Sequence, residues 1–281
     1  MKKTIMRKIV FKGLVFGLTA WAVAGAAEAA DMSAWSDDGH AAVRLIAGSN
    51  DAKAPALRAG VEIKLQPGWH TYWRYPGDSG VPPRFDFSRS DNLAAAKVLY
   101  PAPHLLRDEA GQSLVYEDAV VFPLVVTPKQ AGKPVRLRLK LDYAICEKLC
   151  VPAEARAELD VAPGPSALDA TLKAAEAGVP TPATAADVGL TVRRVNNAPK
   201  PLVAVDFKAA GDKPVQLFVE GPTPEWALPI PVPAQGAPAG HRQFGFELDG
   251  LPPGVDPKGH FELTFTIVEG DRALEVKSHL D

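Results

Sequence analysis

The chain has 281 residues, 31 Lys and Arg against 33 Asp and Glu, and a hydrophobic fraction of 47%. This is enough for one large or two ordinary globular domains whose cores form without cross-links. Without residues 1–29 the balance is 26 basic against 32 acidic side chains (31 − 5 and 33 − 1), which argues against nucleic acid as the partner.

The first 29 residues have the order of a secretory signal peptide. Five Lys or Arg side chains precede an uncharged run at 13–27, and the small-residue pattern Ala27-Glu28-Ala29 follows. We expect cleavage after Ala29. Charged residues or prolines interrupt every later hydrophobic stretch, so the sequence predicts a periplasmic protein with no stable membrane insertion after signal cleavage.

Residues 30–162 are predicted to form an all-β domain. Apolar and polar residues alternate strictly at 61–66, 135–143 and 155–161, which is the pattern of half-buried strands. Shorter apolar runs at 42–47, 98–100 and 120–126 add strands at spacings typical of an antiparallel sandwich.

The composition then shifts to Ala and Pro, and we interpret residues 163–187 as a linker with one short helix. Ser166 is placed to cap that helix, and Gly178 with Pro180 to end it. Residues 188–281 are predicted to form a second β-sandwich-like domain, of unknown role, with strands at 202–207, 215–220, 244–248, 261–268 and 273–276.

The only two cysteines, Cys146 and Cys150, fall in the connection between the strands predicted at 135–143 and 155–161. In an exported protein they can form a disulfide at a hairpin tip. A disulfide that closes a five-residue loop stabilises the folded state by only about 2 kcal/mol, against nearly 5 for a loop of one hundred residues. A purely structural disulfide is therefore the weaker interpretation. Lys148 favours a thiolate and Glu147 opposes it.

Several segments resemble the N-terminal periplasmic domain of the thiol:disulfide interchange protein DsbD and related domains of copper-tolerance and cytochrome-maturation proteins. The resemblance covers roughly residues 32–165. It is carried by WHTYWRYPGDSG at 69–80, YPAPH at 100–104, Asp108-Glu109 through Tyr116 to Phe122-Pro123-Leu124, and YAICEKLCVPAE at 143–154.

The resemblance implies an immunoglobulin-like sandwich that accepts electrons from a membrane-embedded thiol transporter of the DsbD/CcdA type and passes them to periplasmic thioredoxin-like proteins. By position, Cys150 resembles the cysteine that forms the mixed disulfide and Cys146 its resolving partner. Asp108 and Glu109 resemble acidic residues near the active-site cysteines, and Tyr116 a neighbouring aromatic. The residues assigned to partner binding are Tyr116, Tyr143, Lys148 and Pro152.

Two departures from the family pattern stand out. The best-known members space their cysteines more widely, and they carry an aromatic cap after the acidic pair, where this chain has Ala110 and Gly111. We find neither the transmembrane nor the thioredoxin-like portion of full-length DsbD, so we expect the electron donor to be a separate polypeptide.

The remaining candidate residues are the aromatic group Trp69, Tyr72, Trp73 and Tyr75, and six scattered histidines. The rings can line a partner groove, although core packing is favoured for most of them. The histidines show no metal-ligand spacing, so no metal is predicted and the disulfide is the only redox group expected. The alternative to a disulfide-reductase component is a copper-handling or scaffold protein, in which the bridge is structural or its reduced thiols bind Cu(I).

Overall fold

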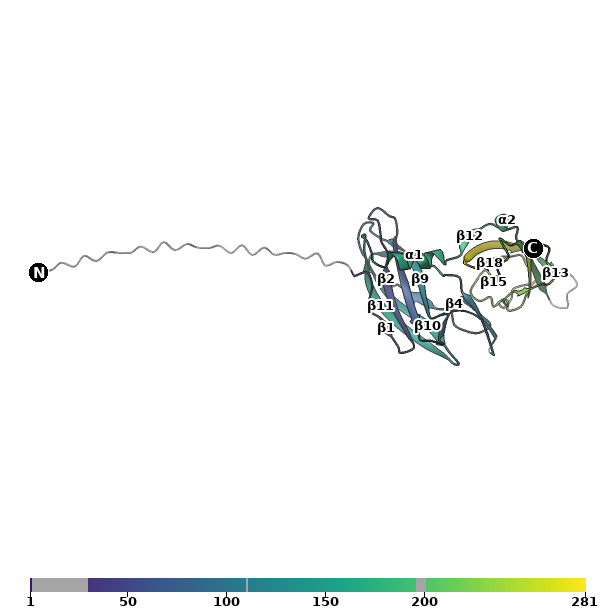
Figure 1. Ribbon diagram of the computed structural model, residues 1–281, viewed down its shortest axis with the longest axis horizontal. Helices are drawn as coiled ribbons and strands as arrows, with labels where there is room; N and C mark the ends of the chain where they lie inside the picture. The colour runs from purple at the N-terminus through teal and green to yellow at the C-terminus, as the bar shows by residue number, and fades with distance from the viewer. Residues whose placement is uncertain (2–29, 110, 196–200) are drawn as a thin grey trace.

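The computed structural model describes Met1 and residues 30–109, 111–195 and 201–281 (Figure 1). The predicted signal peptide lies outside these residues apart from Met1. Within them, no helix is long and apolar enough to cross a bilayer.

The first domain is an antiparallel β-sandwich of two sheets, as the sequence predicts. One sheet contains, in spatial order, β1 (Ser36–Asp37), β2 (Ala41–Ala47), β3 (Leu57–Leu65), β9 (Ala119–Pro128) and β6 (Leu93–Val98). The other contains β11 (Cys150–Val161), β10 (Val135–Cys146), β4 (His70–Gly77), β8 (Gly111–Glu117) and β7 (His104–Asp108), with β5 (Arg84–Asp86) paired to β10. The bounds predicted for the strand at 98–100 are wrong, because β6 ends at Val98. Beyond that end, the ring of Tyr100 packs against Phe122.

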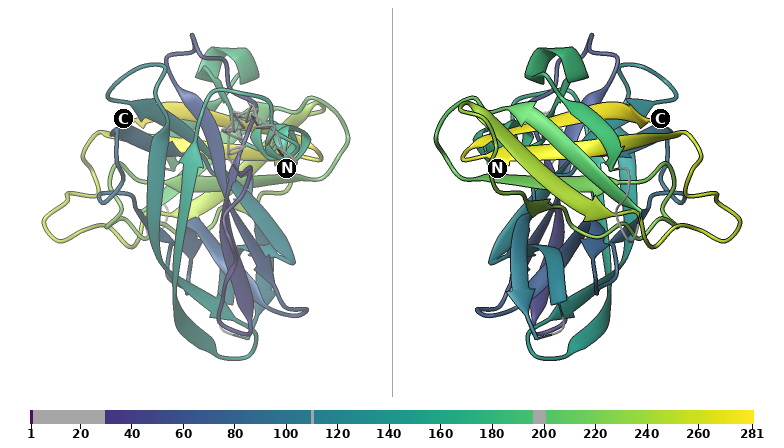
Figure 2. Two further views of the ribbon diagram at one scale, coloured as in Figure 1. Left: turned by 90° about the vertical axis from the view of Figure 1, so that its left-hand side faces the viewer. Right: turned by 90° about the vertical axis from the view of Figure 1, so that its right-hand side faces the viewer.

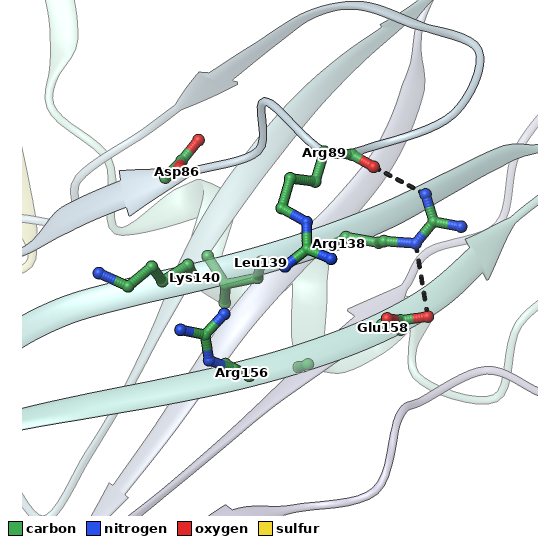
Figure 3. Close-up of a pocket in the computed structure, with 8 residues that line it drawn as sticks. Asp86, Arg89, Arg138, Leu139, Lys140, Arg156 and Glu158 are labelled. Atoms are coloured by element: carbon green, nitrogen blue, oxygen red, sulfur yellow. Dashed lines mark hydrogen bonds and ion pairs between the residues drawn. The ribbon is translucent and has the colours of Figure 1, made fainter.

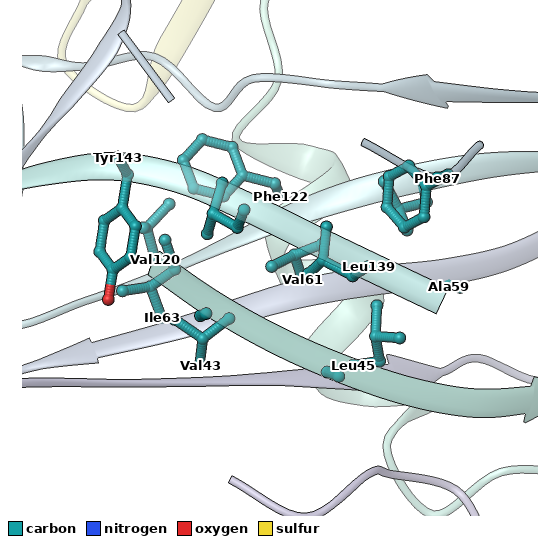
Figure 4. Packing of buried hydrophobic residues seen from close by; sticks show 14 of the residues in the cluster. Val43, Leu45, Ala59, Val61, Ile63, Phe87, Val120, Phe122, Leu139 and Tyr143 are labelled. Carbon is teal, nitrogen blue, oxygen red and sulfur yellow. The ribbon is translucent and has the colours of Figure 1, made fainter. Parts of the chain in front are cut away.

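The core between these sheets is built by alternation. Along β10, Leu137, Leu139 and Leu141 point inward while the charged residues between them stay outside. They meet the apolar faces of β2, β3 and β9, where Val61 and Phe122 are fully buried (Figure 4). A strand with period two therefore faces this core on one side and solvent on the other.

The segment predicted as a linker divides between the two domains. Its helix, α1 (Asp169–Ala177), packs on the first domain through the buried Leu172 and through ion pairs from Arg58 to Asp169 and Glu176. Ser166 is not its N-cap. That position belongs to Leu168, because the Ser166 hydroxyl accepts from the Leu168 N–H and donates to the Ala47 carbonyl instead.

The second domain begins inside the predicted linker, with β12 (Thr181–Ala183) and the short α2 (Ala185–Val188). One sheet contains β12, β19 (Arg272–Leu280), β18 (Phe261–Glu269) and β15 (Val215–Glu220), with β12 parallel to β19. The other contains β13 (Thr191–Val195), β14 (Leu202–Lys208), β17 (His241–Glu247) and β16 (Val232–Pro233).

The domains touch through β4 and the second domain's apolar edge. Phe218 and Ile230 of the second domain join the first domain's core cluster beside Trp73. In the right-hand view of Figure 2, the yellow and green strands of the second domain run across the direction of the blue and teal strands behind them. The second domain thus has its own core and also an apolar contact with the first.

Candidate functional site

The disulfide joins the last residue of β10 to the first residue of β11. Cys146 and Cys150 are directly opposite each other in the antiparallel register, with Cα atoms 4.1 Å apart and only residues 147–149 between them. The alternating strands on either side bring this pair together, because their register runs without interruption from Val135 opposite Val161 up to the tip.

The two cysteine residues differ in exposure because their strands differ in position. β10 lies inside the sheet, where Cys146 also pairs with His70 of β4, and Cys146 is only 2% exposed. β11 is the edge strand, and Cys150 is exposed. Leu149 and Val151 on either side of it are exposed as well, Leu149 to 80%. An incoming thiolate therefore meets Cys150 first.

Tyr72 on β4 covers the buried side of the bridge. Its hydroxyl lies 2.9 Å from the Cys146 Sγ and 3.2 Å from the Cys150 Sγ, and the residue is 2% exposed. Burial, with a smaller contribution from the Asp108 carboxylate, raises the pKa of Tyr72 above its ordinary value of 10. The phenol thus stays protonated at neutral pH and can donate a hydrogen bond to a sulfur.

His70 borders the same group of residues. It is buried, its ring meets the Tyr72 ring edge-on at 5.4 Å, and its main chain pairs with Cys146. Burial lowers the pKa of His70 below 6.5, and the nearby Glu117 and Asp108 carboxylates partly oppose that shift. His70 is therefore predominantly neutral at neutral pH.

Residues 42–162 match the sequence profile of the family described as "Thiol:disulfide interchange protein DsbD, N-terminal". These residues, fewer than half of the chain, are similar to the DsbD N-terminal domain. The match contains both sheets of the first domain from β2 onward, together with the hairpin that carries the disulfide.

A solved structure with the same fold extends the likeness beyond the DsbD-type domain. It is the N-terminal periplasmic domain of ScsB from Proteus mirabilis, with 19% sequence identity and a TM-score of 0.70 over 89% of this chain and 98% of that one. Coverage of this extent includes the second domain as well as the first. No curated protein sequence matches the chain.

The DsbD-type fold places some of the predicted site residues near the bridge. Asp108 ends β7, and its carboxylate acts on the pKa of Tyr72 and of His70. Lys148 lies at the hairpin tip and Pro152 just after it, both exposed. Glu109 is exposed in the turn after β7, whereas Ala110 lies outside the described residues.

Two residues assigned to partner binding lie in the core instead. Tyr116 is 4% exposed and packs against Phe122, and its hydroxyl donates a hydrogen bond to the Pro101 carbonyl. Tyr143 is also 4% exposed and belongs to the inward face of β10. Both face the space between the sheets, so neither offers a partner a surface in this conformation.

The functional side chain that sequence reasoning did not single out is Tyr72. The sequence places Tyr72 only in an aromatic group with Trp69, Trp73 and Tyr75, whose rings either line a partner groove or pack in the core. Alternation along β4 puts Trp73 in the core and so points Tyr72 to the opposite face of the sheet. That signal is present in the sequence, but the pairing of β4 with the cysteine strand is not.

The described residues provide neither a metal site nor a pocket lined only by cations. They contain no group of three or more His, Cys, Asp or Glu side chains arranged to hold a metal ion. A small pocket of about 80 Å³ over β5, β10 and β11 is lined by Arg89, Arg138, Lys140 and Arg156 (Figure 3). Carboxylates pair with Arg138, Lys140 and Arg156. Three of the four cations that line the pocket are thus paired with carboxylates within the protein.

Proposed function

We propose that this protein is a periplasmic thiol-disulfide exchange component that relays electrons from a membrane thiol transporter of the DsbD/CcdA type to thioredoxin-like proteins. The observation that carries the proposal is the asymmetric bridge, with Cys150 exposed at the edge strand and Cys146 buried beneath Tyr72. The cysteine pair carries the electrons in its reduced, dithiol form, so the proposal needs no cofactor.

Reduction begins when a thiolate of the electron donor attacks the Cys150 Sγ. A bond forms between the donor sulfur and Cys150, the bond between Cys150 and Cys146 breaks, and Cys146 leaves as a thiolate. The Tyr72 hydroxyl, 2.9 Å from the Cys146 Sγ, is placed to donate a hydrogen bond to that negative charge. A second donor thiol then attacks the donor sulfur of the mixed disulfide and releases Cys150.

The same chemistry in the opposite sense delivers the electrons. The Cys150 thiolate attacks the disulfide of a thioredoxin-like protein, and Cys146 resolves the mixed disulfide as the original bridge re-forms. Two electrons and two protons pass in each half of the cycle. The exposed Leu149 and Val151 next to Cys150 provide apolar area for either partner, and Lys148 and Pro152 lie within the same surface.

The direct test is to trap the mixed disulfide. We expect Cys146→Ser, which retains Cys150, to form a covalent adduct with a thioredoxin-like protein whose resolving cysteine has been replaced and whose remaining cysteine is activated as a mixed disulfide with thionitrobenzoate. The Cys150 thiolate attacks that cysteine, and thionitrobenzoate leaves. The matched control is Cys150→Ser, whose single sulfur is buried and should form far less adduct. Equal trapping by both variants, or none by either, contradicts the proposal. Tight Cu(I) binding by the reduced protein in the absence of any adduct would favour the copper-handling alternative.

A further inference from the structure

β4 leaves its neighbour β8 directly after the tyrosine that covers the disulfide. The two strands pair at Tyr72 opposite Val115 and again at Gly77 opposite Ser113. Between these points β4 has four residues where β8 has one, so residues 73–76 form an excursion away from the sheet. Everything that fixes this excursion also limits where Tyr72 lies.

Arg74 in the excursion joins the first domain to two carboxylates of the second. Its guanidinium lies 2.7 Å from Glu220 and 2.5 Å from Glu275, and it also stacks over the Trp73 ring. Those carboxylates raise the pKa of Arg74 despite its burial. Since Glu220 is on β15 and Glu275 on β19, a single side chain binds two strands of one second-domain sheet.

The residues on either side of Arg74 are held by the second domain as well. The Trp73 ring packs against Phe218 with centroids 6.0 Å apart, and the Tyr75 hydroxyl donates to the Leu228 carbonyl. Gly77, where the excursion ends, fits tightly because a Cβ there would lie 2.5 Å from the Gln112 carbonyl oxygen and 3.2 Å from Ile230 Cδ1. We call this set of interdomain contacts the clasp.

The chain that leaves the clasp returns over Tyr72. Asp78 exchanges two hydrogen bonds with Gln112 of β8, and Gly80 then lies flat against the tyrosine ring. A Cβ on Gly80 would lie 2.3 Å from Tyr72 Cε1, and the φ of Gly80 is +123°, which disfavours any other residue. The ring is thus held between this loop and the disulfide.

On its other side the loop borders open space. A cavity of about 430 Å³ between the domains is lined by Pro76, Gly77 and Pro82 from the loop and by Glu220 and Trp226 from the second domain. Second-domain side chains therefore do not fill the space beside the two ends of the loop. Hydrogen bonds of Asp78 with Gln112 and of Ser79 with Ser113 hold the loop on β8, and the clasp fixes the residues from which the loop starts.

We propose that the second domain acts as a positioning element for the disulfide, since its clasp on residues 73–77 helps to hold the Gly80 loop against Tyr72 and keeps the phenol aimed at the sulfurs. The inference rests on the proposed exchange function and assigns to that reaction the positioning residues Arg74 and Gly80. Loosening the clasp releases the ring, weakens its hydrogen bond to the Cys146 thiolate and slows opening of the bridge.

The test uses the full mature chain with Arg74→Gln. Two readouts are the rate at which dithiothreitol reduces the disulfide and the pKa of the Cys146 thiol, followed by thiolate ultraviolet absorbance in a Cys150→Ser background. We expect the rate to fall about threefold, and the thiol pKa to rise accordingly, as for weakening of one hydrogen bond. Arg74→Lys, which keeps the charge, should restore most of both values.

Arg44→Gln is the matched control. Arg44 also makes a half-buried ion pair, 2.6 Å from Glu62, and also stacks on a tryptophan, Trp35, but it lies in the opposite sheet. If it changes the rate and the thiol pKa as much as Arg74→Gln does, general loosening is the cause and the inference fails. If Arg74→Gln does not fold, Glu275→Gln removes one carboxylate and leaves Glu220 in place.

The outcomes separate this inference from the proposed function. A Tyr72→Phe variant with an altered thiol pKa, beside an Arg74→Gln variant identical to wild type, overturns the clasp and leaves the exchange reaction standing. If Arg74→Gln still slows reduction in a Tyr72→Ala background, the clasp does not act through the ring, and this too overturns the inference. Loss of adduct trapping with normal dithiothreitol kinetics counts against the partner proposal alone.

Discussion

Tyr72→Phe removes one oxygen atom from the covered side of the disulfide. The hydroxyl contacts both sulfurs, at 2.9 Å for Cys146 and 3.2 Å for Cys150, while the ring keeps its own packing against Gly80, Val115 and Ala144. The variant therefore retains the buried apolar surface and loses only the hydrogen bond. In the oxidised protein this bond goes to neutral sulfur, a weak acceptor, so the loss is felt mainly after the bridge opens.

The expected size follows from the charge on the acceptor. A hydrogen bond to a charged group is worth about 1.5 to 3 kcal/mol, and one pKa unit corresponds to about 1.4 kcal/mol. The Cys146 thiol pKa should therefore rise by about one to two units in Tyr72→Phe. Because the raised pKa of Tyr72 keeps the phenol protonated, the difference should persist from neutral pH to at least pH 9 or so.

The assay is a pH titration of thiolate absorbance for Tyr72→Phe and wild type, both in a Cys150→Ser background. Tyr116→Phe is the control, because it also removes a buried phenol oxygen, one that is bonded to the Pro101 carbonyl and remote from the sulfurs. It should cost about 1 kcal/mol of stability and leave the thiol pKa unchanged. If the pKa of the Cys146 thiol is the same in Tyr72→Phe as in the protein that keeps Tyr72, the phenol does not donate a hydrogen bond to the thiolate and the reasoning is refuted.

Three further predictions concern the surface, the pH dependence and the helix. Leu149→Ser removes exposed apolar area beside Cys150, so it should lower the yield of trapped adduct several-fold and leave the melting temperature unchanged. Its control is Val232→Ser, which also replaces an exposed apolar residue but lies in the second domain; it should change neither the adduct yield nor the melting temperature. Since burial lowers the pKa of His70, the unfolded chain takes up a proton first as pH falls, so the free energy of unfolding should decrease below about pH 6.5, less steeply in His70→Gln. Leu172→Ala empties a fully buried position between α1 and the first domain and should cost about 2 to 5 kcal/mol in chemical denaturation; a loss below 1 would mean that α1 is not part of that domain.

Local pattern was enough to predict the hairpin that carries the cysteines. Alternation at 135–143 and 155–161 requires two half-buried strands, and the short connection leaves the cysteines at the tip. The same alternation places Tyr143 on the inward face with Leu139 and Leu141, and its assignment to partner binding conflicts with that periodicity. For Tyr143 the periodicity gave the correct face.

Contacts between distant segments were beyond the reach of local pattern. The contact between Tyr72 and Cys146 joins residues 74 positions apart, and it depends on β4 being the strand beside β10. The excursion at 73–76 is equally non-local, because Arg74 leaves the sheet only where Glu220 and Glu275 of another domain receive it. The helix N-terminus was misplaced for a similar reason, since the Ser166 hydroxyl bonds to Ala47 across the domain boundary of the predicted linker.

The position of the bridge also explains why reducing it need not disturb the fold. β10 pairs with β4 only at its tip, at Ile145 and Cys146, and the Thr71 hydroxyl donates to the Ala144 carbonyl at the same place. These contacts hold the tip from the side opposite β11, whether or not the sulfurs are joined. Since closure of a five-residue loop contributes only about 2 kcal/mol, the bridge adds little to what β4 already provides. A disulfide that the sheet does not need for its stability can be opened and closed in each turn of the proposed exchange cycle.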